Sequence, residues 1–295
     1  MNWRQKALVF RLLGSIPGRD RIHYLLQKHV TKSIPRPAST YPRYMGESMA
    51  QLRILQPQSA EQKETYFEFG AGWDLFHNLV LFCFGVEQQL LIDLTAHMHP
   101  DLVNAVISNL QRSPPPGALR LPTRPLGSRP LTELREWYGI TYLAPADACK
   151  VPLDSCSVAM AGTTNTLEHI PFSELPAIMT ELRRLCASHA RIAMQVDYSD
   201  HYSHSDPSIS PYNFLQFGEA DWRRYNTHFH FQNRRRHSDY RKLFTTCGFS
   251  IVGEEIYRPA AWEAQLDAIT LHQDFREYGR DDVGVTSATF SLRPG

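Results

Sequence analysis

Between residues 65 and 113 the chain alternates short apolar runs with longer segments of helical periodicity, and this alternation constrains the fold more than any other feature of the sequence. The apolar runs fall at 66–69 and 88–94, and the helical segments at 73–85 and 100–110. Short strands that alternate with helices of this length pair in parallel and are covered by those helices. The sequence therefore predicts an α/β domain.

The rest of the chain continues this pattern after an interruption. Residues 113–130 are rich in proline and are expected to form a surface loop or an insertion. A helix is predicted to begin at Ser238, as its N-cap, and to end before Gly248. A second, amphipathic helix is predicted at 172–186. Further strands are predicted at 140–147, 157–163, 190–198, 251–259 and 285–294.

The first 60 residues are expected to form an N-terminal helical extension with a linker, and residues 61–295 one main domain. Residues 32–60 are rich in Pro, Ser, Gln and Thr, which favours an extended connection. Apolar residues recur at helical spacing near the start of the chain, at Trp3, Ala7, Phe10 and Leu13. Such a helix either packs over the main domain or makes peripheral contact with a membrane surface, and the sequence leaves both open.

Composition excludes several classes of protein. The 31 Lys and Arg residues nearly balance the 30 Asp and Glu residues, so no long nucleic acid is expected as a partner. The five cysteines contain no Cys-x-x-Cys pair, which is typical of reduced thiols rather than of a disulfide framework or a zinc site. The sequence has no recognisable secretory signal and no apolar run of about 20 residues. We therefore expect a cytoplasmic protein, and the sequence does not indicate its oligomeric state.

Four of the predicted strands end in glycine, acidic or hydroxyl residues, at the edge of the sheet where ligands gather. Glu68 precedes a turn with Gly70 and Gly72, where missing β-carbons let a ligand approach the backbone. Asp93 stands 21 residues after Gly72, at the end of a strand, where a carboxylate can accept hydrogen bonds from both hydroxyls of a ribose. The other two groups are Asp147–Ala148 and the segment from Thr163 to His169.

These residues resemble the class I S-adenosylmethionine-dependent methyltransferases, in particular the group with a Leu-Glu-His signature. The resemblance covers about residues 65–255 and lies in the order and spacing of the motifs. The motifs are Glu68-Phe69-Gly70-Ala71-Gly72, Leu91-Ile92-Asp93-Leu94, Ala146-Asp147-Ala148, Val151-Pro152-Leu153-Asp154 and Thr166-Leu167-Glu168-His169-Ile170. The resemblance implies a doubly wound, mostly parallel seven-stranded sheet of Rossmann-like topology, and an enzyme that uses S-adenosylmethionine.

The resemblance also assigns parts of the cofactor to particular residues. Glu68, Gly70, Ala71 and Gly72 form the cofactor-binding turn, with the two glycines against the methionine part. Asp93 would hold the ribose, Asp147 and Ala148 the adenine, and Thr163 and Thr164 would lie beside the sulfonium.

Asp74 departs from the family's pattern, which has a third glycine at this position. A carboxylate in the first turn of a helix is favoured by the helix dipole. A dinucleotide would need to seat its pyrophosphate at that helix N-terminus, whereas S-adenosylmethionine has no pyrophosphate. Asp74 therefore argues against a dinucleotide more than against a methyl donor.

The loop after the strand at 190–198 is rich in Asp and His and is the predicted acceptor site, because the corresponding loop borders the acceptor pocket in the methyltransferases that the chain resembles. For a hydroxyl acceptor, His201 is the candidate base and His169 the second candidate. The predicted substrate contacts in this loop are Asp197, Asp200 and His204. The spacing of His201 and His204 would also suit a divalent cation, but hydrogen-bonded networks are the more usual role of such loops, and no metal is predicted.

Residues 221–242 contain seven Lys or Arg against two acids, with aromatic residues between them. Such a segment either binds an anionic acceptor, with Arg234 as a predicted contact, or forms a solvated basic face over core aromatics. The signature of nitrogen methylation, Asn or Asp followed by two prolines and an aromatic residue, is absent after the strand at 157–163. We therefore expect O-methylation of a small-molecule, sugar or glycan-like acceptor.

Two other functions remain open at this point. A non-catalytic methyltransferase-like subunit would keep the fold and bind a partner, and Asp74 would then mark the loss of the cofactor. An NAD-dependent oxidoreductase would use a similar sheet, but it would favour a glycine in place of Asp74. Binding of S-adenosylmethionine, of NAD or of neither distinguishes the three.

Overall fold

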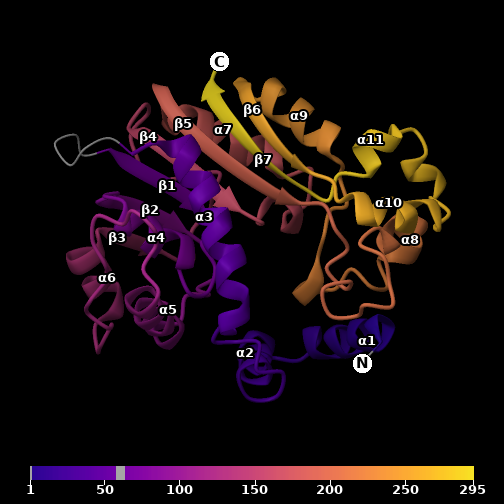
Figure 1. Ribbon diagram of the computed structural model, residues 1–295, viewed down its shortest axis with the longest axis horizontal. Coiled ribbons are helices and arrows are strands. Elements are labelled where there is room, and N and C mark those ends of the chain that lie inside the picture. The colour runs from indigo at the N-terminus through magenta and orange to yellow at the C-terminus, as the bar shows by residue number, and fades with distance from the viewer. Residues whose placement is uncertain (1, 58–63) are drawn as a thin grey trace.

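A computed structural model describes residues 2–57 and 64–295, and these form a seven-stranded sheet in the order β3-β2-β1-β4-β5-β7-β6 (Figure 1). The strands are β1 Thr65–Phe69, β2 Gln88–Ile92, β3 Ile140–Leu143, β4 Val158–Thr164, β5 Cys186–Asp197, β6 Phe249–Tyr257 and β7 Ser287–Pro294. Strands β1 to β5 pair in parallel, whereas β7 runs antiparallel to both β5 and β6. The predicted doubly wound, mostly parallel sheet is confirmed.

Helices cover both faces of the sheet. The α-helices are α1 Trp3–Gly14, α2 Arg19–His29, α3 Tyr41–Leu55, α4 Phe76–Cys83, α5 Pro100–Arg112, α6 Pro130–Tyr138, α7 Leu175–Leu185, α8 Glu219–Trp222, α9 His237–Thr246, α10 Ala260–Asp267 and α11 Arg280–Val283. Short 3₁₀ helices are η1 Ala38–Thr40, η2 Leu167–His169, η3 Asn213–Gln216, η4 His228–His230 and η5 Gln273–Phe275. Side chains of α7 and α9 form the core on one face, and those of α3, α4, α5 and α6 form the core on the other.

The order of the strands determines where a ligand can bind. The chain goes from β1 outward to β2 and β3, and then returns to place β4 on the other side of β1. The connections after β1 and β4 therefore leave the sheet toward opposite faces, which opens a crevice at the carboxyl ends of these strands. The glycine turn after Phe69 and the segment after Thr164 lie at this crevice.

The predicted extended linker at 32–60 is wrong over half of its length, because it contains the 15-residue helix α3. Leu52 and Leu55 of α3 are buried against the sheet, and Tyr41, Met45 and Met49 pack partly beside them. The prolines of this segment favoured a linker, yet a proline in the first helical turn, as at position 42, is compatible with a helix. The predicted boundary between residues 60 and 61 lies outside the described residues.

Helix α1 packs against the carboxyl half of the chain through its first apolar residues. Trp3 and Ala7 are buried, and the Trp3 ring contacts the rings of Tyr202, Trp222 and Tyr225. On another side of α1, Leu8 and Leu12 are exposed. Among the described residues, no helix is long and apolar enough to cross a membrane. The face of α1 that carries Trp3 and Ala7 thus packs on the main domain. Contact of this helix with a membrane surface stays a prediction.

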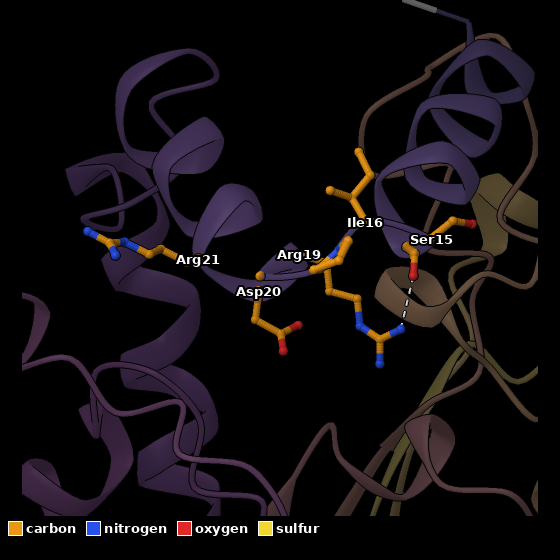
Figure 2. A pocket seen from close by; sticks show the side chains of 8 residues that line it. Ser15, Ile16, Arg19, Asp20 and Arg21 are labelled. Carbon is orange, nitrogen blue, oxygen red and sulfur yellow. Dashed lines mark hydrogen bonds between the residues drawn. The ribbon is translucent and has the colours of Figure 1, made fainter.

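Figure 2 shows the turn between α1 and α2, with the side chains of Ser15, Ile16, Arg19, Asp20 and Arg21. The Arg19 guanidinium donates a hydrogen bond of 2.9 Å to the carbonyl of Gly14. In Figure 2 the Arg21 side chain points away from Arg19 and Asp20. Asp20 instead forms an ion pair with His228, whose Nε2 lies 3.4 Å from its carboxylate. The extension is thus tied to the loop that precedes α9.

Two predicted element ends are corrected by the structure. Strand β3 ends at Leu143 rather than at Asp147. Helix α9 begins at His237 with Arg236 as its N-cap, because the carboxylate of Asp239 accepts a hydrogen bond from the backbone of Arg236. Ser238 is therefore not the N-cap, and its hydroxyl and backbone amide bind Asp282 instead. Gly248 follows the last turn in the left-handed conformation, with φ of 81°, as predicted.

The basic segment 221–242 does not form a continuous basic surface. Arg234 is buried and donates to the carbonyls of Phe214 and Phe217 and to Glu219. Arg236 is fully buried and donates to the carbonyls of Tyr198, Val283 and Val285. These guanidinium groups satisfy backbone carbonyls that water cannot reach, so they hold the carboxyl half of the fold together.

Replacement of Arg236 by Met should lower the free energy of unfolding by at least about 3 kcal/mol, because buried carbonyls lose their donor. Urea denaturation of the variant measures this. The exposed neighbour provides the control, since Arg235→Met should change stability by less than about 0.5 kcal/mol. Equal stability of the two variants would show that the buried guanidinium contributes nothing.

Candidate active site

One cavity of about 1230 Å³ lies at the carboxyl ends of the central strands. Its walls come from the loops that follow β1, β2, β3, β4 and β5, and from the N-terminal segment between Asp20 and Tyr44. Most of the predicted site residues line it: Glu68, Gly70, Ala71, Gly72, Asp93, Asp147, Ala148, Thr164, His169, Asp197, His201 and His204. Residues that are far apart in the sequence are therefore brought to one place.

The glycine turn uses its two glycines for different purposes. Both have positive φ, 75° for Gly70 and 77° for Gly72, a conformation that other residues adopt rarely. A β-carbon at Gly70 would lie 2.2 Å from the side chain of Thr166, so this glycine allows β1 and the β4 loop to approach. A β-carbon at Gly72 would meet no atom within 4 Å. Gly72 therefore turns its bare backbone toward the open cavity.

Asp74 connects the glycine turn to the N-terminal extension. Its carboxylate forms a bidentate ion pair with the guanidinium of Arg36. It also accepts a hydrogen bond of 3.3 Å from the backbone amide of Phe76, in the first turn of α4. The Arg36 guanidinium also lies 3.8 Å from the centre of the Tyr44 ring. The acid in place of the third glycine thus caps a helix and pairs with a cation, and it leaves Gly70 and Gly72 unobstructed.

Asp93 directly follows β2 and is held in place by the next strand. Its carboxylate accepts a hydrogen bond of 2.7 Å from the hydroxyl of Tyr142. Burial raises the pKa of Asp93 to about 6, although hydrogen bonds from Tyr142 and from the backbone of Gly72 and Ala71 oppose the rise. Leu94 follows, lines the same cavity and exposes 78% of its surface. A carboxylate beside an uncovered apolar side chain suits a ligand with both hydroxyl groups and an apolar ring.

The third part of the predicted cofactor site lies after β3. Asp147 and Ala148 line the cavity, and the Asp147 carboxylate accepts a hydrogen bond of 2.8 Å from the backbone of Cys149, within its own loop. The opposite walls are apolar and come from helices on both sides, at Leu102, Val106 and Ile178. This part of the cavity can enclose a flat, largely apolar ring.

Glu68 and the two threonines have different environments. The Glu68 carboxylate accepts hydrogen bonds from Tyr66 and Asn78, and burial raises its pKa to about 7. Thr164 lines the cavity, and its hydroxyl is bound by Gln51 of α3. Thr163 is fully buried, and its hydroxyl donates to the carbonyl of Phe69 at 3.0 Å. The structure therefore places Thr163 behind the cavity wall.

The Asp and His side chains after β5 form a connected group. Nε2 of His201 lies 3.4 Å and Nε2 of His204 lies 3.7 Å from the carboxylate of Asp197. Burial alone would raise the pKa of Asp197, but His201, His204 and the Ser199 hydroxyl outweigh burial and hold it well below its usual value. Burial and the charge of His201 lower the pKa of His204 to about 4. Near neutral pH this group therefore carries an ionised Asp197 beside His201.

The other two predicted acceptor contacts lie elsewhere. Asp200 is fully buried and binds the side chain of Asn213 and the backbone of Tyr202. Arg234 holds backbone carbonyls, as described above, and does not line the cavity. A sequence pattern could not separate these side chains from Asp197 and His204, because an irregular loop has no fixed period to indicate direction.

His169 faces the same group from the β4 side. Its Nδ1 lies 2.7 Å from the carbonyl of Phe231, and its ring centre is 4.9 Å from that of His201. The His169 side chain is exposed to the cavity, yet the protein around it and the nearby His201 lower its pKa to about 4, so the ring is neutral at pH 7. The preceding residue, Glu168, is buried, and its pKa is raised well above the usual value, chiefly by burial and then by the charge of Asp197.

Many cavity residues were not predicted from the sequence, and one group of them belongs to the N-terminal extension. Arg36, Tyr41 and Tyr44 line the cavity from the segment expected to be a linker. Helix α2 also reaches the site through Asp20, His23 and Gln27. Its Tyr24 stacks on His99, with ring centres 3.8 Å apart. Trp73 stacks on His97 beside them. No local motif marks these residues, since they meet only when the extension folds over the sheet.

The fold matches those of solved methyltransferases at low sequence identity. A geranyl diphosphate methyltransferase in complex with SAM aligns with a TM-score of 0.51 and 10% identity, over 89% of this chain and 93% of that chain. The geranyl diphosphate C-methyltransferase of Streptomyces coelicolor A3(2), in complex with Mg²⁺, geranyl diphosphate and S-adenosyl-L-homocysteine, aligns with the same TM-score and identity, over 89% of this chain and 86% of that chain. No family model matches the sequence, and a search of curated proteins finds no significant match. The chain thus has the Rossmann-like methyltransferase fold.

Loss of the Arg36–Asp74 pair should weaken the attachment of the extension to the glycine turn. Asp74→Ala should lower the free energy of unfolding by about 1–3 kcal/mol, since a largely buried hydrogen-bonded ion pair is broken and a helix cap is lost. Urea denaturation measures the change. The exposed Arg53–Glu255 pair is the control, because Glu255→Ala should have almost no effect. An Asp74 variant as stable as the Glu255 variant would contradict this role.

Proposed function

We propose that the protein is an S-adenosylmethionine-dependent methyltransferase that methylates an oxygen of a small-molecule, sugar or glycan-like acceptor. One observation carries this proposal: a single cavity unites the glycine turn, Asp93 and Asp147–Ala148 with a group of Asp and His side chains. The first set fits a nucleoside-containing cofactor, and the second fits a hydroxyl group that must lose a proton.

The cofactor fits the residues of this chain in three respects. The open space at Gly72 leaves room for the methionine part against the backbone. Asp93 offers carboxylate lone pairs to two ribose hydroxyls, and the exposed Leu94 offers an apolar surface to the adenine. Asp147 and Ala148 would border the edge of that ring. The cofactor, when bound, supplies an electrophilic methyl group, so the protein mainly has to align the acceptor with it and exclude water.

The N-terminal extension would contribute to the exclusion of water. Its residues line the cavity from Asp20 to Tyr44, and the Arg36–Asp74 pair ties them to the glycine turn. Stacking of Tyr24 on His99 adds a second contact, between the extension and the loop before α5. A closed site of this kind strengthens every polar contact made with the acceptor.

His201 would receive the proton of the acceptor hydroxyl, with the ionised Asp197 beside it to stabilise the resulting positive charge. His169 is neutral and faces His201, so it would orient the acceptor or share this role. The polar groups of Asn165, Asn226 and Thr227 also line the cavity. This density of hydrogen-bonding groups favours an acceptor with several hydroxyl groups.

Binding of S-adenosylhomocysteine should weaken as the pH falls through about 6, because the carboxylate of Asp93, whose pKa is raised to about 6, is then protonated. Between pH 8 and pH 5 the dissociation constant should rise about tenfold. Isothermal titration over this range measures the effect. Asp93→Asn should bind at least about tenfold more weakly at pH 8 and show no such pH dependence.

The exposed Asp221 supplies the matched control, since Asp221→Asn should bind like the wild type at every pH. Binding that is equal in the Asp93 and Asp221 variants would exclude the proposed ribose contact. Failure of the wild type to bind S-adenosylhomocysteine would favour a non-catalytic subunit, and binding of NAD in its place an oxidoreductase.

Replacement of His201 by Ala should lower kcat by about 10²–10⁴-fold without a change in the affinity for S-adenosylhomocysteine, because only the acceptor side is altered. Single-turnover methyl transfer from radiolabelled cofactor to hydroxyl-rich acceptors measures the rate. His189, exposed on β5 and remote from the cavity, provides the control variant. A His201 variant with the rate of the His189 variant would remove His201 from the mechanism.

A further inference from the structure

A group of three side chains on the acceptor side of the cavity has the composition of a metal site. Glu168 and His169 come from η2, and His201 comes from the loop after β5. Each offers one ligand atom, and these three atoms lie within 4.8 Å of one another. His169 and His201 also line the cavity, so the group is reached from the space where an acceptor would bind.

Glu168 provides a second and independent indication of a ligand. Only 3% of the residue is exposed, and among the described residues neither of its carboxylate oxygens has a hydrogen-bond partner. The Nε2 atom of His201 is also buried, and it lies 3.4 Å from the carboxylate of Asp197. Buried polar atoms are nearly always paired, because an unpaired group loses its interactions with water and gains nothing in return. Because the ligand atoms of Glu168 and His201 lie within 4.8 Å of each other, one cation could bind both side chains.

The hydrogen bond of His169 determines which of its nitrogens is free. A backbone carbonyl only accepts, so Nδ1 of His169 carries the hydrogen and donates it to Phe231 at 2.7 Å. Nε2 then keeps its lone pair and can bind a cation. Histidine ligands of metals are held in this way, with the second ring nitrogen donating to a carbonyl or a carboxylate.

Negative charge around the group also favours a cation. Asp197 lies 3.4 Å from the His201 ring, and the charges of Asp197 and of Glu47 on α3 both act on Glu168. Glu47 itself lies 3.8 Å from the guanidinium of Arg43 and 3.8 Å from Nε2 of His77. Glu168 and Asp197 thus place two carboxyl groups beside the His201 ring.

We propose that Glu168, His169 and His201 bind one divalent transition-metal cation. Two imidazole nitrogens and one carboxylate oxygen suit Mn²⁺, Fe²⁺, Co²⁺ or Zn²⁺, whereas Mg²⁺ and Ca²⁺ favour sites made of oxygen atoms. Ligand atoms around such a cation lie about 3 Å apart, so the three side chains close inward by roughly 1–2 Å on binding.

The role of this cation rests on the proposed function, whereas its binding does not. Three protein ligands leave coordination positions open toward the cavity, where an acceptor with neighbouring hydroxyl groups can bind through two oxygens. A cation bound there lowers the pKa of a coordinated hydroxyl. In the metal-loaded protein His201 is a ligand, and the activation of the hydroxyl passes from its ring to the cation.

Titration of the chelator-treated protein with Mn²⁺, followed by electron paramagnetic resonance, tests the proposal without any acceptor. The signal of free Mn²⁺ should fall until one ion is bound per chain. Glu168→Gln and His169→Ala should each raise the dissociation constant at least about tenfold, whereas the exposed His189→Ala should leave it unchanged. Wild-type protein that binds no Mn²⁺ at millimolar concentration, or a Glu168 variant that binds like the wild type, would overturn the proposal.

Thermal unfolding separates loss of the site from loss of the fold. In the presence of chelator, the Glu168→Gln variant should melt at or above the melting temperature of the wild type. Glutamine has nearly the same shape as glutamate, and it removes the unpaired buried carboxylate. Addition of Mn²⁺ should raise the melting temperature of the wild type and not that of the variant. Binding of S-adenosylhomocysteine by the same samples tests the proposed function separately, so failure of either proposal leaves the other standing.

Discussion

The reversal of strand order between β1 and β4 is the constraint on which the rest of the structure depends. It places the carboxyl ends of five parallel strands around one crevice, and every loop that carries candidate chemistry begins there. The two sides of the crevice have different compositions. Glycine, an acid and apolar walls lie after β1, β2 and β3, whereas histidines and acids lie after β4 and β5. This division is what a two-substrate reaction needs, since each substrate meets its own set of side chains.

The N-terminal extension makes this crevice a cavity. Helix α3 packs on the sheet, α2 contacts the loop before α5, and Arg36 pairs with the acid that replaces a glycine in the turn after β1. The nine Lys and Arg residues among the first 46, against a single acid, make this part of the chain strongly basic, whereas the rest of the chain carries 22 Lys and Arg against 29 acids. Asp74, which replaces the third glycine of the family's pattern, is the ion-pair partner of one of these cations, Arg36. The acid at this position is therefore accounted for by the basic extension.

The sequence predicted the sheet well, for physical reasons. Parallel strands buried on both faces are apolar runs with clear ends, and the residues at those ends must lie at one edge. Gly70, Gly72 and Asp93 could therefore be placed together from position, and they do line one cavity. The acceptor side was predicted less completely, because in an irregular loop the direction of a side chain depends on tertiary contacts. Asp200 and Arg234 had the right chemistry for a site but are buried among backbone groups that need them, and α3 was missed because prolines precede a helix whose stripe contains Ser48 and Gln51.

A crystal structure of the protein with S-adenosylhomocysteine would test the central claim most directly. We expect the homocysteine part against Gly70 and Gly72, the ribose hydroxyls on Asp93, and the adenine between Leu94 and Ile178 beside Asp147–Ala148. Its sulfur should then point toward His201 and Asp197. The account would be contradicted if the cavity stayed empty in crystals grown with millimolar S-adenosylhomocysteine. It would also be contradicted if the ligand bound with its sulfur pointing away from His201 and Asp197.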